Sequence, residues 1–113
     1  MPDCVFCKMS AGEIPVQRIA ENEHAFAVRD INPRAPVHAL IIPKRHVESA
    51  REFEWVHGDL LAGMFMLSKD VARLEGAWEA GYRLAFNVGD AAGMSIAHLH
   101  LHLLGGRSLG PEG

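Results

Sequence analysis

Three histidines, His98, His100 and His102, alternate with leucines in residues 97–104. Successive side chains of a β-strand point to opposite faces, so this spacing predicts a strand with imidazoles on one face and leucines on the other. A helix would scatter the same residues around its axis. Neutral imidazole acts near neutral pH as a base, a nucleophile or a metal ligand. The segment therefore predicts a reactive surface on an apolar core, and the spacing alone leaves nucleophilic catalysis and direct metal ligation both open.

Cys4 and Cys7 form a CxxC pair, the second group of residues with metal-binding chemistry. Such a pair supplies half of a tetrahedral zinc site and needs two further ligands. The alternative is two unligated thiols in a small apolar cluster. No strand–helix–strand pattern surrounds the pair, so a thioredoxin-like redox role is not expected.

Composition restricts the class of protein. The chain has 113 residues, 49% of them hydrophobic and 22% charged, which predicts one small globular domain. Its net charge of −3 gives no broad basic field, so we expect no nucleic-acid polymer as a partner. No apolar run approaches the about 20 residues of a membrane span, so no membrane partner is expected either. Residues 1–4 lack the pattern of a secretory signal, and we predict a cytoplasmic location with reduced cysteines.

Hydrophobic patterning predicts five strands and one long helix. The expected strands cover residues 17–20, 25–28, 39–42 and 82–88, with a fifth that begins near residue 95 and carries the histidines. The expected helix covers residues 54–75 and ends before Gly76. Its buried stripe consists of Leu60, Met64, Leu67, Val71 and Leu74. This order predicts an α+β domain, an antiparallel five-stranded sheet with its helix on one face.

The histidine segment, preceded by Gly93-Met94-Ser95 and followed by Gly105-Gly106-Arg107, resembles the signature of the histidine triad (HIT) family. Within that family it is most similar to the branch of small nucleotide-binding phosphoramidases. Further family motifs occur in the same order along the chain: Phe6-Cys7-Lys8, residues 12–15, residues 30–38 with Asp30 and His38, residues 42–46, and Asn87-Val88-Gly89. The resemblance covers about residues 3–107 of a single domain, 1–113, and leaves residues 108–113 as a C-terminal tail.

The resemblance implies a HIT-like fold, in which a short N-terminal helix accompanies the sheet and the long helix. It also implies a homodimer with the two sheets joined across the interface. Leu61 and Phe65 widen the apolar face of the long helix beyond its buried stripe and are available for such an interface. The alternative is that a helix packed on a sheet needs an apolar face of this width.

The implied activity is a purine nucleoside 5′-phosphoramidate hydrolase, an adenosine phosphoramidase that releases AMP. Its nucleophile would be His100, through a covalent nucleotidyl-histidine intermediate. His102 would contact the α-phosphate and assist proton transfer to the leaving amine. His98 is the first histidine of the triad, and His38 would lie behind the triad. Catalysis needs no cofactor, and the partner is a small AMP-type purine nucleotide. Two alternatives remain: a dinucleoside polyphosphate hydrolase of the same family, and a purine nucleotide-binding regulatory module with little turnover.

Substrate-binding positions follow from the same resemblance. Asp30 matches the carboxylate that accepts hydrogen bonds from ribose hydroxyls, and its alternative role is to cap a proline-rich turn. Ile31 and the apolar residues near Phe26 and Val28 are candidates to sandwich the base, and their alternative role is to pack in the core. The positions that match the phosphate loop are Asn87, Gly93 and Ser95.

Metal-bearing members of the superfamily imply a ligand set for the CxxC pair. Residues of the required types stand at the matching places, and they predict a structural zinc site of Cys4, Cys7, His46 and His98. The chain departs from the family at Met94, where glutamine is usual, and in residues 108–113, which lack the tryptophan of some relatives. Both departures affect the leaving-group side, so hydrolysis of aminoacyl adenylates is less expected than the core phosphoramidase reaction.

Overall fold

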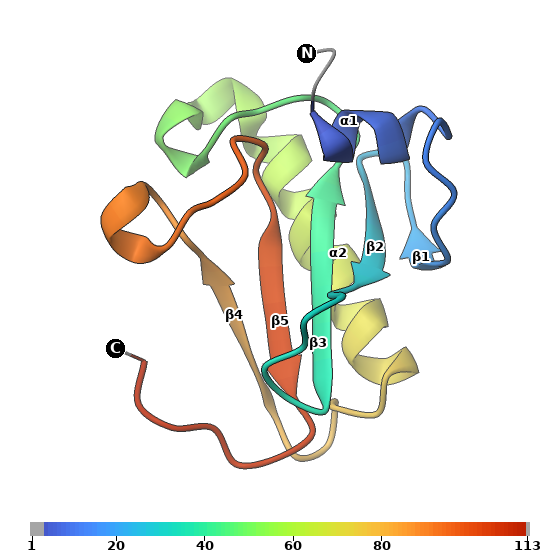
Figure 1. Ribbon diagram of the computed structural model, residues 1–113, viewed down its shortest axis with the longest axis vertical. Coiled ribbons are helices and arrows are strands. Elements are labelled where there is room, and N and C mark those ends of the chain that lie inside the picture. Colours follow the sequence, from blue (N-terminus) through green and yellow to red (C-terminus); the bar gives the residue numbers. More distant parts are fainter. Residues whose placement is uncertain (1–3, 113) are drawn as a thin grey trace.

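A computed structural model describes residues 4–112, so the two ends of the predicted domain, residues 1–3 and 113, lie outside the described residues. Five antiparallel strands form one sheet in the order β1-β2-β3-β5-β4, and helix α2 lies behind it in the view of Figure 1. The strands are β1 (Arg18–Glu21), β2 (Ala25–Arg29), β3 (Val37–Pro43), β4 (Tyr82–Phe86) and β5 (Leu101–Gly105). The helices are α1 (Val5–Ser10) and α2 (Gly58–Leu74). The predicted α+β class, the five-stranded sheet and the short N-terminal helix are confirmed.

Alternation along the strands divides the sheet into a helix face and an open face. On the helix face, Ile41 of β3 and Leu101 and Leu103 of β5 are buried against α2. The helix contributes Leu60, Met64, Leu67 and Val71 to the same core. On the opposite face, α1 packs through Phe6 onto an apolar cluster of β2 and β3. Histidines of β3 and β5 therefore point away from α2, toward the open face. None of the helices in the described range is long and apolar enough to cross a membrane.

Helix α2 is shorter than the predicted range of residues 54–75. Glu54 and His57 form a capping box around a separate 3₁₀ turn, Trp55–His57, in which the Glu54 backbone N–H donates to His57 Nδ1 at 3.0 Å. This turn ends before the α-helix begins, which explains the wrong N-terminal boundary. Leu74 was also wrongly placed in the buried stripe: it is 63% exposed, because it is the final residue of the helix. Gly76 follows with a φ of 80°, in agreement with the predicted helix end.

Strand β5 begins at Leu101, later than the predicted start near residue 95. Ile41 pairs with Leu101, so continued pairing would bring Leu99 opposite Pro43. Proline has no N–H to donate to the ladder, and the Leu99 N–H bonds instead to the carbonyl of Val47 at 2.6 Å. The prediction that all three histidines lie on one regular strand is therefore wrong for His98 and His100.

Candidate functional site

A cavity of about 570 Å³ opens on the sheet face opposite α2. Its volume falls within the roughly 300–1,000 Å³ typical of small-molecule sites. Its lining comes from α1, from the loop that follows β2, from β3 and β5, and from residues 87–96. Seven predicted site residues line it together: Asp30, Ile31, Asn87, Gly93, Ser95, His100 and His102. His38 and His98 are buried and lie outside this lining.

The ring of His100 is held in one tautomer. Its Nδ1–H donates to the carbonyl oxygen of His98 at 2.8 Å, and this bond fixes the orientation of the ring. With the proton on Nδ1, the lone pair of Nε2 is available as a nucleophile. Phe6 packs edge-on against the ring, with the two centroids 5.1 Å apart. These contacts orient a nucleophilic nitrogen without a separate base.

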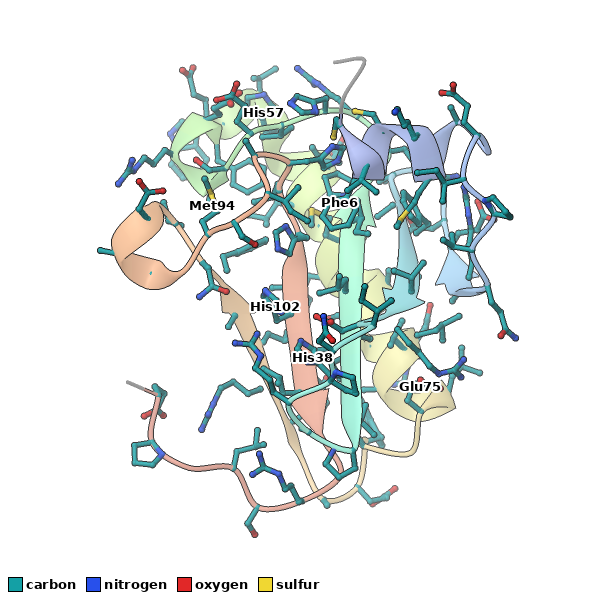
Figure 2. The ribbon with its side chains drawn as sticks, in the orientation of Figure 1. Phe6, His38, His57, Glu75, Met94 and His102 are labelled. Atoms are coloured by element: carbon teal, nitrogen blue, oxygen red, sulfur yellow. The ribbon has the colours of Figure 1, made fainter. Side chains whose placement is uncertain are left out.

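His38 and His102 form a proton-ordered pair behind the cavity, side by side on β3 and β5 (Figure 2). The backbone N–H of Arg34 donates to His38 Nδ1 at 3.1 Å, so a neutral His38 carries its proton on Nε2. That Nε2–H donates to His102 Nδ1 at 2.9 Å. His102 in turn must carry its own proton on Nε2. A single backbone bond thus makes His102 a hydrogen-bond donor at its remaining nitrogen.

Burial keeps the pair neutral. Desolvation, and then the charges of His100 and His38, lower the pKa of His102 to about 4. Desolvation also lowers the pKa of His38, although the Asp30 carboxylate, with Oδ2 3.4 Å from His38 Nε2, opposes the shift. His102 therefore meets a ligand at neutral pH as a neutral donor.

The loop after β2 supplies the acidic and apolar residues of the cavity. Asp30 Oδ1 accepts the Asn32 N–H at 2.8 Å, so the turn-capping role that the sequence left open is present. Ile31 is 91% exposed at the cavity rim. Val28 lines the wall, whereas Phe26 does not and takes the alternative role in the core. Phe26 is fully buried in the cluster beneath α1 because it faces that core.

Residues 87–96 form the opposite wall. Asn87 Nδ2 donates to the Ala92 carbonyl at 2.8 Å and fastens the loop. Gly93 has a φ of 84°, a conformation that side chains with a Cβ rarely adopt. Ser95 is exposed on the cavity lining. Met94, labelled in Figure 2, is half-buried and is not among the lining residues. The loop is thus held close to His100 by backbone geometry and one amide.

Sequence reasoning did not assign Phe6 or Arg34 to the site. Phe6 lies on α1 (Figure 2). Its ring contacts the rings of both His98 and His100. Arg34 places Nη2 3.5 Å from His102 Nδ1. Phe6 carried no periodic signal in so short a helix, and a lone arginine in a proline-rich loop has no local pattern that points to a site. Only the folded chain brings them to the histidines.

The CxxC pair lies at the N-terminal end of α1, where Cys4 is the N-cap. Cys4 Sγ lies 3.2 Å from His98 Nδ1, and Cys7 Sγ lies 3.2 Å from His46 Nδ1. The two Nδ1 atoms are 3.1 Å apart. All four ligand atoms lie within 4.8 Å of one another. The predicted ligands therefore converge on one point.

The donor set fits a tetrahedral zinc ion. Bond lengths of about 2.0–2.3 Å imply edges of about 3.3–3.8 Å between ligand atoms, close to the observed spacing. The Nε2–H of His98 donates to the Pro43 carbonyl at 2.9 Å. This bond leaves Nδ1 of the buried ring unprotonated and directed at the thiols, as a metal ligand requires. Because His98 faces the thiols and His102 faces His38, the three triad histidines do not converge on one ion.

The sheet topology, the cavity and the ordered histidines define a protein of the HIT class. Residues 11–109 match the HIT domain family, and the chain belongs to that family. It is 38% identical to the purine nucleoside phosphoramidase of Escherichia coli K12 over 109 residues, which covers 96% of this chain and 92% of the relative.

Solved structures agree with this membership. The crystal structure of a HIT family hydrolase from Legionella pneumophila Philadelphia 1 has a TM-score of 0.90 and 45% identity, and the match covers 94% of this chain and 95% of that one. A zinc-bound histidine triad protein from Mycobacterium smegmatis has a TM-score of 0.80 and 32% identity, with 94% and 76% coverage.

Proposed function

We propose that the protein is a purine nucleoside 5′-phosphoramidate hydrolase that releases AMP through a covalent nucleotidyl-His100 intermediate. The observation that carries the proposal is the tautomer order of the histidines. His100 presents a free Nε2 lone pair, and His102 beside it, at 5.1 Å between ring centroids, presents an Nε2–H donor. A phosphoramidate needs both, a nucleophile for phosphorus and a donor on the phosphate or leaving-group side. The E. coli relative named as a purine nucleoside phosphoramidase supports the same substrate class.

The chemistry proceeds in two displacements. Nε2 of His100 attacks the α-phosphorus, the P–N bond breaks, and the amine leaves with a proton drawn from solvent, while the neutral His102 donates its Nε2–H to the phosphate or the leaving nitrogen. An equal proton returns to solvent when the intermediate is hydrolysed. Water then attacks the phosphorus of the nucleotidyl-histidine, the P–Nε2 bond breaks, and AMP is released. The water supplies one hydrogen to the amine and its oxygen to AMP, so the net reaction is hydrolysis. As positive charge develops on the phosphorylated ring, the His98 carbonyl that accepts Nδ1–H stabilises it.

The cavity accommodates the nucleotide beside these histidines. Asp30 Oδ2 is placed to accept from ribose hydroxyls while Oδ1 caps the turn, so the two roles are compatible. Ile31 at the rim and Val28 on the wall contact the base. Ser95 and the loop at Gly93 lie on the phosphate side.

Incubation with adenosine 5′-phosphoramidate tests the proposal. The parent protein is expected to release AMP, and His100→Ala is expected to lose that activity while it keeps the parent's thermal unfolding temperature. If the parent binds AMP tightly but releases none from the phosphoramidate, the proposed enzyme activity is wrong and the protein is a nucleotide-binding module.

We also propose that Cys4, Cys7, His46 and His98 hold a structural zinc ion. The ion would tie the start of α1 to the segments that follow β3 and precede β5. Since His98 supplies both a ligand and the carbonyl that orients His100, the same segment would connect zinc binding to the order of the active site. The zinc-bound relative from M. smegmatis supports the choice of metal.

A homodimer through α2 and β4 is the proposed assembly. Strand β4 is an edge of the sheet. Beside it, Leu61 and Phe65 are 41% and 52% exposed and line an apolar hollow with residues of β4 and β5. A second copy related by a two-fold axis would cover this surface. The cytoplasmic location stays a prediction from the sequence.

A further inference from the structure

A second hollow of about 240 Å³ adjoins the nucleotide cavity on the far side of His102. Three residues, Arg34, Asn87 and His102, line both spaces, so the two hollows adjoin at these side chains. The rest of its lining comes from β4, from the end of β5 and from the C-terminal segment, which runs below the sheet and back toward β4 (Figure 1). A group attached to a phosphorus at His100 and directed past His102 would lie in this hollow.

Arginines dominate the lining. Arg34, Arg83 and Arg107 all contribute, and Glu112 is the single acidic residue among the described lining residues. The ion pairs found within residues 4–112 involve other arginines, such as Arg29 with Glu75. The hollow thus carries an excess of positive charge next to the site of reaction.

The backbone organises these three side chains. Arg107 Nη2 donates to the Arg34 carbonyl at 2.9 Å and holds the loop that carries Arg34. Arg83 Nη2 donates to the Gly110 carbonyl at 2.7 Å and holds the C-terminal segment as a wall. Arg34 lies beside the histidine, with Nη2 3.5 Å from His102 Nδ1. Each guanidinium has five N–H donors, so most of its donors remain available to a ligand.

Volume limits what the hollow can hold. At about 240 Å³ it is smaller than the roughly 300–1,000 Å³ of sites that bind whole drug-sized ligands. A hollow of this size suits a small group such as an amino acid or a short phosphorylated amine. Guanidinium groups recognise carboxylate and phosphate oxygens in particular.

We infer that this hollow is a leaving-group subsite that selects phosphoramidates whose departing amine carries an anionic group, a carboxylate or a phosphate. The inference rests on the proposed phosphoramidase function and names the substrate class of the same site. The bonds that change are those already described: P–Nε2 forms, P–N breaks, and the amine leaves with one proton. The anionic group takes no part in the covalent steps. It anchors the leaving group so that the nitrogen lies beside His102.

Three adenosine 5′-phosphoramidates test the subsite, with leaving amines of nearly equal length: β-alanine, 2-aminoethyl phosphate and the neutral β-alaninamide. The parent protein is expected to show about tenfold higher kcat/KM for at least one anionic amine than for the amide, as expected for a charge-assisted hydrogen bond. The preference should weaken in about 0.5 M salt, because the arginines are partly exposed. A preference for one anion alone supports the inference and identifies that anion.

Two variants locate the effect. Arg34→Gln and Arg83→Gln are each expected to reduce the anion-to-amide ratio of kcat/KM toward one, and the second variant keeps the test valid if the first fails to fold. Arg73→Gln is the matched control: it removes an arginine of α2 that pairs with Asp70, and it should retain the parent's ratio.

Equal kcat/KM for the three substrates in the parent would overturn the inference and leave the proposed function intact. An anion preference that survives in both variants would overturn it as well. Cleavage of none of the three would overturn the proposed function itself, and this inference with it.

Discussion

Replacing His38 by alanine tests the proton order of the active site. In the parent, His38 Nε2–H donates to His102 Nδ1 at 2.9 Å, and both side chains are at least nine-tenths buried. The variant leaves His102 Nδ1 without its donor, so the ring loses the constraint that keeps its own proton on Nε2. Loss of one buried partner costs about 1–3 kcal/mol, which corresponds to about a 5- to 150-fold decrease in kcat/KM if the bond is needed in the transition state.

The assay is the release of AMP from adenosine 5′-phosphoramidate under subsaturating conditions, with thermal unfolding measured on the same samples. His24→Ala is the matched control, because His24 is a half-buried histidine that packs against Gly63 of α2, outside the lining of the cavity. It should keep kcat/KM near the parent's value. A folded His38→Ala protein with activity within about twofold of the parent would refute the tautomer argument, since the expected loss starts at about fivefold.

Three further predictions follow from the burial of His102, the metal cluster and the apolar face. The folded-state pKa of His102, about 4, lies below its usual value, so its contribution to stability is full above about pH 6.5 and is lost as the pH falls toward 4. The loss of unfolding free energy between these pH values is at most about 3 kcal/mol, measured by chemical unfolding. His102→Gln should lack this loss, and a variant that loses as much stability in acid as the parent would contradict the prediction. Gently purified protein should contain about one equivalent of zinc, and Cys7→Ser should lose the metal and unfold at a lower temperature; a parent that contains little zinc and gains none on reconstitution would contradict the site. Light scattering should give a dimer for the parent and a monomer for Leu61→Glu, whereas a fully active parent with single-chain mass at micromolar concentration would contradict the interface.

Local patterns in the sequence were sufficient for most of the fold. The alternation of His102 with Leu101 and Leu103 gives the two faces of β5, because a strand has a period of two and the leucines alone are buried against α2. The apolar residues of α2 recur every three or four positions, which matches the 3.6-residue period of a helix and predicts its buried stripe from Leu60 to Val71. These features depend on residues that are close in sequence, so the periodic pattern of each segment is enough to predict them.

Other features depend on partners distant in sequence. His98 leaves the expected strand because Pro43, 55 positions away, ends the ladder and accepts a bond from its ring. The resemblance to the family placed the cavity residues in one group, and the structure brings them to one cavity, but their roles in binding and catalysis stay predictions. Neither local pattern nor resemblance indicated Arg34, whose backbone sets the tautomer of His38 and whose side chain reaches His102. Tertiary contact alone reveals that double role.

The covalent intermediate at His100 is the central claim, and trapping it is the most direct test. The parent protein is mixed rapidly with an adenosine 5′-phosphoramidate, quenched in conditions that preserve a phosphorus–nitrogen bond, digested and mapped by mass spectrometry. We predict an adenylyl group on His100 that forms within one turnover and is absent in His100→Ala. An adduct on any other residue, or AMP release at the parent's rate from His100→Ala, would contradict the account.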